Sequence, residues 1–324
     1  MLATIRETYR MFSAMELSLL TQHDWPQQLL TWIEKTHGAP SRAERLAGMS
    51  LNGVWRVLFD DASVIVKAGA SENESRFYER VAPSMRAAGI PIPALYLTHH
   101  EPERHWLVIE DIPTPLPIPS AGDWQPDERI VAILARLHAT TRAQPPNLPE
   151  RKPHRWLPES TTAALGCLKP DDAAALAPLL ERLQRESVVD GEPWCWISGD
   201  PNPRNWGLRA DGTPVLFDWE LFGTGMPATD LAIIVPGLGN LDAYDRAAAA
   251  YLAAWDAAGL PPWDAATLTR QIAVAKVATV VQLLHGHASG SANVGNDIVG
   301  WLADAVPAWV HSIHDAETGT SGSS

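Results

Sequence analysis

Short apolar runs and longer amphipathic segments alternate along the chain, and this alternation predicts its elements. In the first third, the apolar runs 54–59 and 63–67 flank Asp60-Asp61-Ala62 and predict a β-hairpin. The other elements expected there are one or two helices over 15–37, a helix over 71–88, and strands near 95–98 and 106–109. The later apolar residues recur at helical spacing and predict helices over 126–142, 171–186, 241–258, 265–285 and 298–314.

The proline-rich segment IPTPLPIPSAGD, residues 112–123, separates these two parts of the chain. Its prolines exclude a helix and a central strand. The pattern therefore predicts an α+β protein with two lobes. The expected organisation is a lobe with an antiparallel sheet over 1–110, a hinge over 111–122, a mainly helical lobe over 123–315 and a mobile tail over 316–324.

A second hairpin is expected around the turn dipeptide Asp211-Gly212, which separates two further apolar runs. Asn205 and Asp218 fall at the open ends of its strands, and Asp200 lies in the loop that leads in. Two carboxylates and a carboxamide held this close favour a divalent cation with oxygen ligands, because the like charges otherwise repel. The alternative is that each residue caps a turn or ends a strand in solvent.

Lys67 ends an apolar strand, a position where a lysine often keeps its amine in water while its stem packs. In the helix that follows, Ser71 and Glu74 have the spacing of a capping box, which would direct Glu74 to the backbone at the helix start. Glu74 also shares an inward-facing stripe with Phe77 and Tyr78. An inward glutamate opposite a strand-end lysine predicts an ion pair that holds the ammonium ready for a phosphate.

The composition is that of a globular chain of 324 residues, with 46% hydrophobic residues and a formal net charge of −13. That charge and the lack of clustered Lys and Arg argue against a nucleic-acid partner. Cys167 and Cys195 cannot form a disulfide framework, which suggests a reducing compartment. No signal peptide or membrane-spanning run is evident, so we expect a cytoplasmic protein without a membrane partner.

The order of these parts resembles that of the protein kinases, and in detail that of the aminoglycoside phosphotransferase and choline kinase family of small-molecule kinases. The resemblance spans roughly residues 45–285 and rests on ESRFYERVAP from 74, LARLHA from 134, SGDPNPRN from 198, LFDWE from 216 and PATDLA from 227. It implies a protein-kinase-like fold. It also implies transfer of the γ-phosphate of ATP to a hydroxyl of an aminoglycoside, amino alcohol or sugar-like molecule, with Mg²⁺.

The resemblance gives each matching residue a role. Asp200 would accept the proton of the acceptor hydroxyl, and Asn205 and Asp218 would hold magnesium. In the nucleotide-binding lobe, Lys67, positioned by Glu74, would bind the nucleotide phosphates. The remaining assignments are Ser50, Asn52 and Gly53 over the phosphates, the backbone near Glu110 and Ile112 against adenine, and Glu220 on the substrate side.

The residue before the Gly-Asp pair departs from the family pattern, because the family has a histidine there and this chain has Ser198. A serine fills less space, although it can still hydrogen bond locally. Asp230 is expected to anchor this loop. The departure leaves a second hypothesis open, that of a pseudokinase or nucleotide-binding regulatory module. A magnesium-dependent hydrolase would leave Lys67 and Glu74 unexplained.

The acceptor is not specified by the sequence, and neither is the oligomeric state. The pocket that binds the acceptor is expected in the helical region after Asp230. Three tryptophans there offer apolar walls, namely Trp255, Trp263 and Trp301.

Overall fold

A computed structural model describes residues 25–46, 53–102, 104–117, 124–143, 156–187, 195–291 and 294–319. The residues before 25, the small-residue loop over 47–52 and the tail beyond 319 lie outside this set. The chain forms two units. The first holds residues up to 83 together with 92–113, and the second holds residues 84–91 and those from 114 onward.

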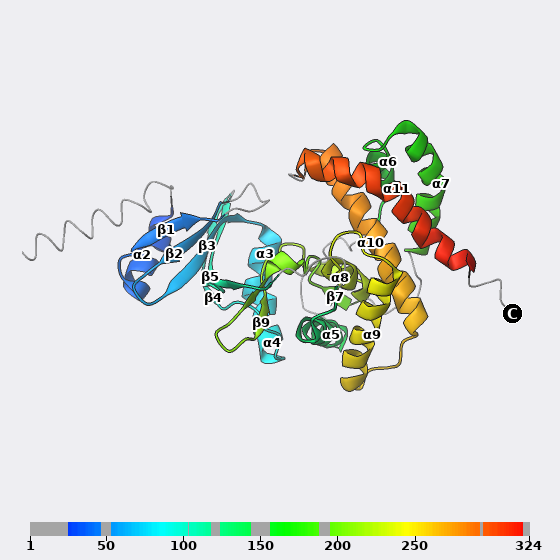
Figure 1. Ribbon diagram of the computed structural model, residues 1–324. Coiled ribbons are helices and arrows are strands. Elements are labelled where there is room, and N and C mark those ends of the chain that lie inside the picture. The colour runs from blue at the N-terminus through cyan, green and yellow to red at the C-terminus, as the bar shows by residue number, and fades with distance from the viewer. Residues whose placement is uncertain are drawn as a thin grey trace, which may run out of the picture. The chain divides into compact units, whose positions relative to one another are not determined.

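The first unit is built on an antiparallel sheet of five strands in the order β1-β2-β3-β5-β4 (Figure 1). The strands are β1 Arg42–Arg45, β2 Gly53–Leu58, β3 Ser63–Ala70, β4 Leu95–Glu101 and β5 Arg104–Glu110. The predicted hairpin β2–β3 and the predicted strands β4 and β5 are confirmed. Strand β1, which lies at the sheet edge, has no apolar run and was not predicted.

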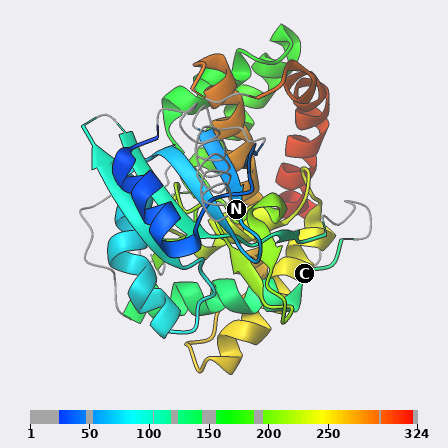
Figure 2. The same cartoon turned by 90° about the vertical axis from the view of Figure 1, so that its left-hand side faces the viewer.

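Helix α2, Gln27–His37, covers one face of this sheet (Figure 2). Its buried Leu29, Leu30 and Ile33 join a core that includes Val64 and Val66 of β3. Successive side chains of a strand point to opposite faces. Lys67 therefore lies on the face away from α2, as the alternation in the sequence predicts.

The helix predicted over 71–88 is present in three segments, α3 Glu72–Arg76, the π-helical turn η1 Phe77–Val81 and α4 Ala82–Ala87. Within η1 the amide of Ala82 donates to the carbonyl of Phe77, five residues back. The predicted inward stripe is confirmed, because Glu74, Phe77 and Tyr78 are each at most 1% exposed.

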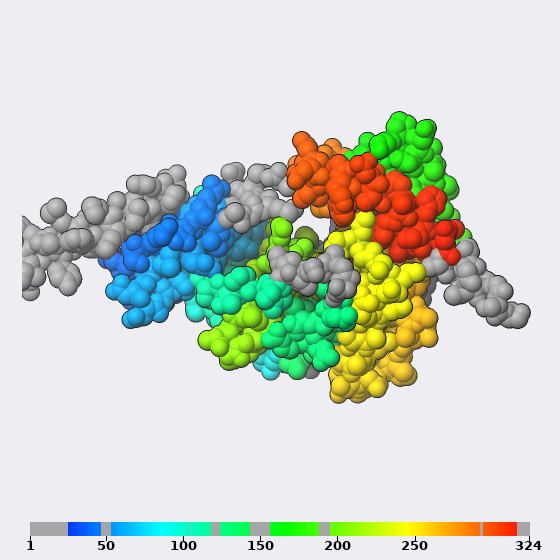
Figure 3. Space-filling model, viewed as in Figure 1, coloured from blue at the N-terminus to red at the C-terminus, as the bar shows by residue number. Residues whose placement is uncertain are grey.

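The second unit is mainly helical. Its helices are α5 Glu128–Ala143, α6 Pro158–Leu165, α7 Pro170–Glu186, α8 Pro227–Ile234, α9 Leu241–Ala257, α10 Ala265–Ala288 and α11 Asn296–Gly319. Helix α10 is the central one and packs against α6, α8 and α9. Helix α11 lies against α7 (Figure 3). The longer helices match the predicted ones, whereas the eight-residue helices α6 and α8 were not predicted.

Short strands hold the loops of the second unit in place. The predicted hairpin is present as β8 Trp206–Leu208 and β9 Pro214–Leu216, and β6 Thr114–Pro115 pairs with β8 at the edge. An edge position suits the proline-rich segment, since proline has no backbone N–H to donate and an inner strand must donate on both sides. Strands β7 Cys195–Ile197 and β10 Gly223–Gly225 form a separate pair. Among the described helices, none has the length and apolarity to span a membrane.

Candidate active site

Asp200 and Asn205 are in direct contact in the loop that follows β7. The chain passes from Asp200 through a short 3₁₀ turn, Pro203–Asn205, and the Asn205 amide then donates to the Asp200 carboxylate and to its carbonyl, both at 3.0 Å. The amide of Phe217 donates to the Asn205 carbonyl at 3.0 Å, which places Asn205 beside the residue that precedes Asp218. The hairpin register thus brings Asn205 next to the end of β9, as the sequence predicts.

Asp218 has a left-handed backbone conformation, with φ at +67°. Among the described residues it is the sole non-glycine residue with positive φ. Aspartate and asparagine adopt this region more readily than other residues with a Cβ, yet the conformation is sparsely populated. Such backbone strain concentrates at functional sites, where the surrounding structure holds it.

The carboxyl of Asp200 is electrostatically perturbed. Burial, and next the negative charge of Asp218, raise the pKa of Asp200 from 3.8 to about 6, while the hydrogen bond from Asn205 opposes this shift. The two aspartates are therefore close enough to repel, as expected. Within the described chain, no group of three or more His, Cys, Asp and Glu side chains could hold a metal ion. A cation here would rest on the Asp218 carboxylate, the Asn205 amide oxygen and water, with the Asp200 carboxylate close by.

The donor set fits a hard divalent cation. Both protein ligands are oxygens, which Mg²⁺ and Ca²⁺ prefer, and one carboxylate with one amide leaves positions for water and phosphate oxygens. A bound cation would also offset the repulsion that raises the pKa of Asp200.

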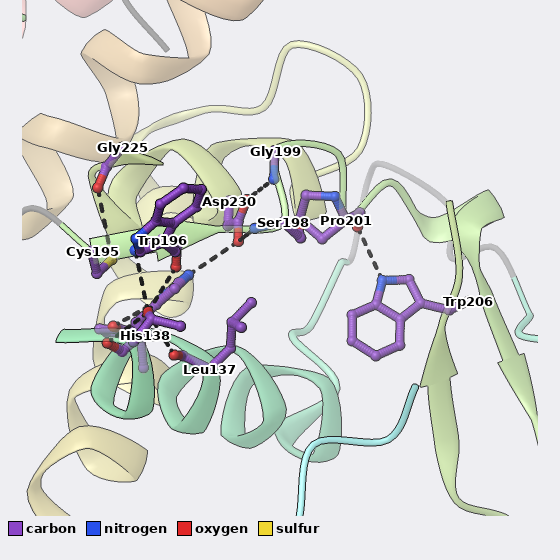
Figure 4. Close-up of polar contacts among 12 residues, drawn as sticks. Leu137, His138, Cys195, Trp196, Ser198, Gly199, Pro201, Trp206, Gly225 and Asp230 are labelled. Carbon is purple, nitrogen blue, oxygen red and sulfur yellow. Dashed lines mark hydrogen bonds and ion pairs between the residues drawn. The ribbon is translucent and has the colours of Figure 1, made fainter. Parts of the chain in front are cut away.

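The loop that carries Asp200 is anchored by Asp230 of α8 (Figure 4). Its carboxylate accepts hydrogen bonds from the backbone amides of Ser198 and Gly199, both at 2.9 Å. His138 of α5 bonds the same carboxylate through Nε2 at 3.0 Å and bonds the hydroxyl of Tyr251 through Nδ1 at 2.9 Å. His138 and Asp230 are fully buried, so a network from three helices fixes the start of the loop. The expected anchoring role of Asp230 is confirmed.

Ser198 fixes the loop through its backbone rather than its side chain. Its hydroxyl is buried and has no hydrogen-bond partner among the described residues, so the local bond that a serine can form is not made there. The backbone amide of Ser198, through Asp230, holds the loop instead. Further on, the indole of Trp206 donates to the carbonyl of Pro201 at 3.1 Å, which fixes the loop at a second point (Figure 4).

In the first unit, the predicted ion pair is present. Lys67 Nζ lies 2.6 Å from Glu74 Oε1, and the two side chains are 16% and 1% exposed. Ser71 caps the helix by accepting from the amide of Glu74 at 3.1 Å. Ser71 therefore caps the helix as in a capping box, while the Glu74 side chain pairs with Lys67 of the sheet.

The other nucleotide-binding assignments lie at strand ends of the first unit or outside the described residues. Ser50 and Asn52 are not described, and Gly53 begins β2, where a Cβ would lie 1.8 Å from the ring of Trp55. Glu110 ends β5, and its backbone amide and carboxylate both bond the backbone of Ala94. Ile112 is buried after β5. The substrate-side assignment, Glu220, belongs to the second unit and is partly buried in the turn after Asp218.

One polar cluster escaped the sequence analysis. Arg56 of β2 bonds both oxygens of Asp111, at 2.7 and 3.1 Å, and Ser63 donates to Asp111 at 2.7 Å. The side chain of Asp111 is 2% exposed. This cluster fixes the chain directly after Glu110. The sequence signals for this cluster are the acidic pair Glu110-Asp111 at the end of one strand and Arg56 inside another, apolar strand.

The three tryptophans expected around the acceptor have different environments. Trp255 is 2% exposed, stacks on Tyr251 at 5.6 Å and meets Trp263 edge-on at 6.0 Å. Trp255 is thus a core residue of the second unit. Trp301 of α11 is 52% exposed.

The sequence matches the model of a family described as "Phosphotransferase enzyme family" over residues 42–268. The chain belongs to this family. This phosphotransferase is accordingly a small-molecule kinase by family. No curated protein sequence matches it.

Solved structures show that the phosphotransferase has the protein-kinase-like fold. An amicoumacin kinase in complex with AMP-PNP, Ca²⁺ and Ami aligns with a TM-score of 0.62 and 14% identity, over 91% of this chain and 95% of that one. A spectinomycin phosphotransferase in complex with ADP and spectinomycin gives 0.56 and 12%, over 89% and 93%. The choline kinase LicA from Streptococcus pneumoniae gives 0.54 and 16%, over 88% and 100%.

Proposed function

We propose that this phosphotransferase moves the γ-phosphate of ATP to a hydroxyl group of a small molecule. The observation that carries the proposal is the contact of Asp200 with Asn205 beside the strained Asp218, in a loop anchored by buried hydrogen bonds. Phosphoryl transfer asks a protein mainly for positioned charges, and this arrangement supplies them. The acceptor classes that fit the family are aminoglycosides, amino alcohols and sugar-like molecules.

Asp200 is the residue proposed to accept the hydroxyl proton. The Asn205 amide orients its carboxylate, and a pKa of about 6 leaves the carboxylate ionised at neutral pH yet more basic than an ordinary aspartate. A base whose pKa lies near the working pH is the most effective in general base catalysis.

Lys67 is proposed to bind the nucleotide phosphates. Its ammonium is oriented by the buried Glu74 carboxylate at 2.6 Å, so little side-chain freedom remains to be lost when a phosphate binds.

Asn205 and Asp218 are proposed to hold Mg²⁺, with Asp200 close by. When bound, the metal would neutralise charge on the phosphate oxygens. The strained backbone of Asp218 fixes the direction of its carboxylate. The AMP-PNP, ADP and Ca²⁺ in the relatives' complexes support a nucleotide and a divalent metal as ligands of this chain.

The test compares two aspartates of the site. Asp218→Ala should weaken ATP binding and remove the stabilisation that Mg-ATP gives, about 2.7 kcal/mol at a hundredfold excess over Kd. Asp200→Ala should keep most of that stabilisation and lose about 10²–10⁴ in turnover, because it removes a general base and leaves the metal ligands. Thermal shift and ATP consumption against a panel of hydroxyl acceptors give the two readouts.

Asp245→Ala is the matched control, because Asp245 is an exposed aspartate of the same unit. Its turnover and its response to Mg-ATP should equal those of the wild type. The alternative is a nucleotide-binding regulatory module. It would be identified if ATP stabilises the wild type, no acceptor is phosphorylated, and Asp200→Ala behaves as the wild type does in both assays.

A further inference from the structure

A pair of histidines lies at the end of the β4–β5 hairpin. His100 of β4 and His105 of β5 are direct cross-strand partners, and their Nδ1 atoms are 2.6 Å apart. The two rings meet edge-on, with centroids 4.9 Å apart and an interplanar angle of 74°. Both Nδ1 atoms therefore converge on one point. The His100 side chain is 45% exposed.

A carboxylate holds the far nitrogen of His100. Glu79 of η1 places Oε1 2.8 Å from His100 Nε2. The oxygens of a glutamate carboxylate are acceptors, so Glu79 accepts the hydrogen bond from His100 Nε2. The Nε2 atom of His100 must then carry the proton, which leaves a lone pair on Nδ1 facing His105. Carboxylate–histidine pairs of this kind are the usual support of a metal-binding imidazole.

We propose that His100 and His105 bind a transition-metal ion such as Zn²⁺ through their Nδ1 atoms, with water completing the coordination. Two nitrogens that each lie about 2.0–2.1 Å from an ion are about 2.9–3.4 Å apart. From the 2.6 Å of the structure, the rings need to separate by less than about 1 Å. The described chain offers no third His, Cys, Asp or Glu for the same ion, so the site has two protein ligands.

The neighbouring side chains leave this face to the pair. On the opposite face of β4, His99 Nε2 lies 3.6 Å from Glu101 Oε1. Arg104 lies over the ring of Trp106 at 5.3 Å. Glu79 is the charged side chain that bonds the pair. Imidazole ligands also separate this site from the oxygen-lined site around Asp200, since imidazole suits Zn²⁺ and carboxylate suits Mg²⁺.

Calorimetric titration of the full chain with ZnCl₂ tests the proposal, in excess MgCl₂ to occupy hard oxygen sites. The wild type should bind one zinc ion per chain saturably, with both imidazoles bound in their neutral form. Glu79→Gln should weaken zinc binding about tenfold, and His105→Ala should weaken it further. His99→Ala is the matched control and should bind as the wild type does.

Equal zinc affinity of the wild type and His105→Ala would overturn the proposal, as would the lack of saturable binding by the wild type. The melting temperature without zinc shows that each variant is folded. The rise in melting temperature with zinc should be present in the wild type and His99→Ala and lost in His105→Ala. Asp218→Ala should keep the zinc affinity, so this test and that of the phosphotransferase activity can fail independently.

Discussion

At the scale of single residues, Asp218 combines an unfavourable backbone with a charged side chain. The left-handed φ of +67° costs an ordinary L-residue about 1–2 kcal/mol, and aspartate somewhat less. The nearby Asp200 adds electrostatic repulsion. The fold therefore holds this residue against two local preferences, which a purely structural strand end would not require.

Replacement of Asp218 separates the two effects. Asp218→Gly and Asp218→Ala both remove the charge, but only glycine relaxes the backbone. The glycine variant should therefore be more stable than the alanine variant by about 1 kcal/mol in urea unfolding without ligands. Equal stabilities of the two variants would contradict a strained backbone at this position. Both should lose the stabilisation by Mg-ATP, because neither retains the carboxylate.

At the scale of elements, α8 is joined to the loop that follows β7 through one carboxylate. Asp230 accepts from two backbone amides and from His138 in a site without solvent exposure. Asp230→Ala leaves three buried donors without their acceptor and should cost at least about 3 kcal/mol in the free energy of unfolding. Asp245→Ala, on the surface of α9, should stay within about 0.5 kcal/mol. A loss below about 1 kcal/mol in Asp230→Ala would show that the network contributes little.

The elements also show what the sequence can and cannot predict. The Asp-Gly turn fixes the register of β8 and β9, so the approach of Asn205 to Asp218 was predictable. Strands β7 and β10 have three residues each, too few for a period to appear. The pairing of His100 with His105 depends on a register that shifts between Leu95 and Leu97, which alternation alone does not reveal.

At the scale of the whole molecule, the pH dependence of stability sums over every titrating group. Lys276 of α10 is buried, and its ammonium donates to the carbonyls of Ala232 and Val235 at 3.0 and 2.6 Å. Burial lowers its pKa from 10.5 to about 8. Below pH 8 both the folded and unfolded chains carry this proton. Between pH 8 and 10.5 only the unfolded chain binds it, so this lysine makes stability rise with pH.

Lys276→Met should remove this rise. Between pH 8 and 10.5 the wild type should gain up to about 3 kcal/mol relative to the variant, which is the pKa difference expressed as free energy. Denaturant unfolding at several pH values measures this free-energy difference. Because the variant is subtracted from the wild type, the contributions of other groups that titrate at alkaline pH cancel, such as that of Tyr244, whose pKa is raised by burial. Lys35→Met, at an exposed position of α2, should show no such pH dependence. A constant difference between wild type and Lys276→Met across this range would refute the assignment.

At the π-turn Phe77–Val81, the chain can lose one residue without disrupting the helix. A turn closed by a bond over five residues holds one residue more than an α-turn, so loss of an exposed residue such as Arg80 would leave an ordinary α-helix. The same deletion inside α5 would rotate every later residue of that helix by about 100° and turn its polar side inward. The helix that carries Glu74 can therefore gain or lose one residue at this turn during evolution. The buried residues that precede the turn keep their positions on the helix face.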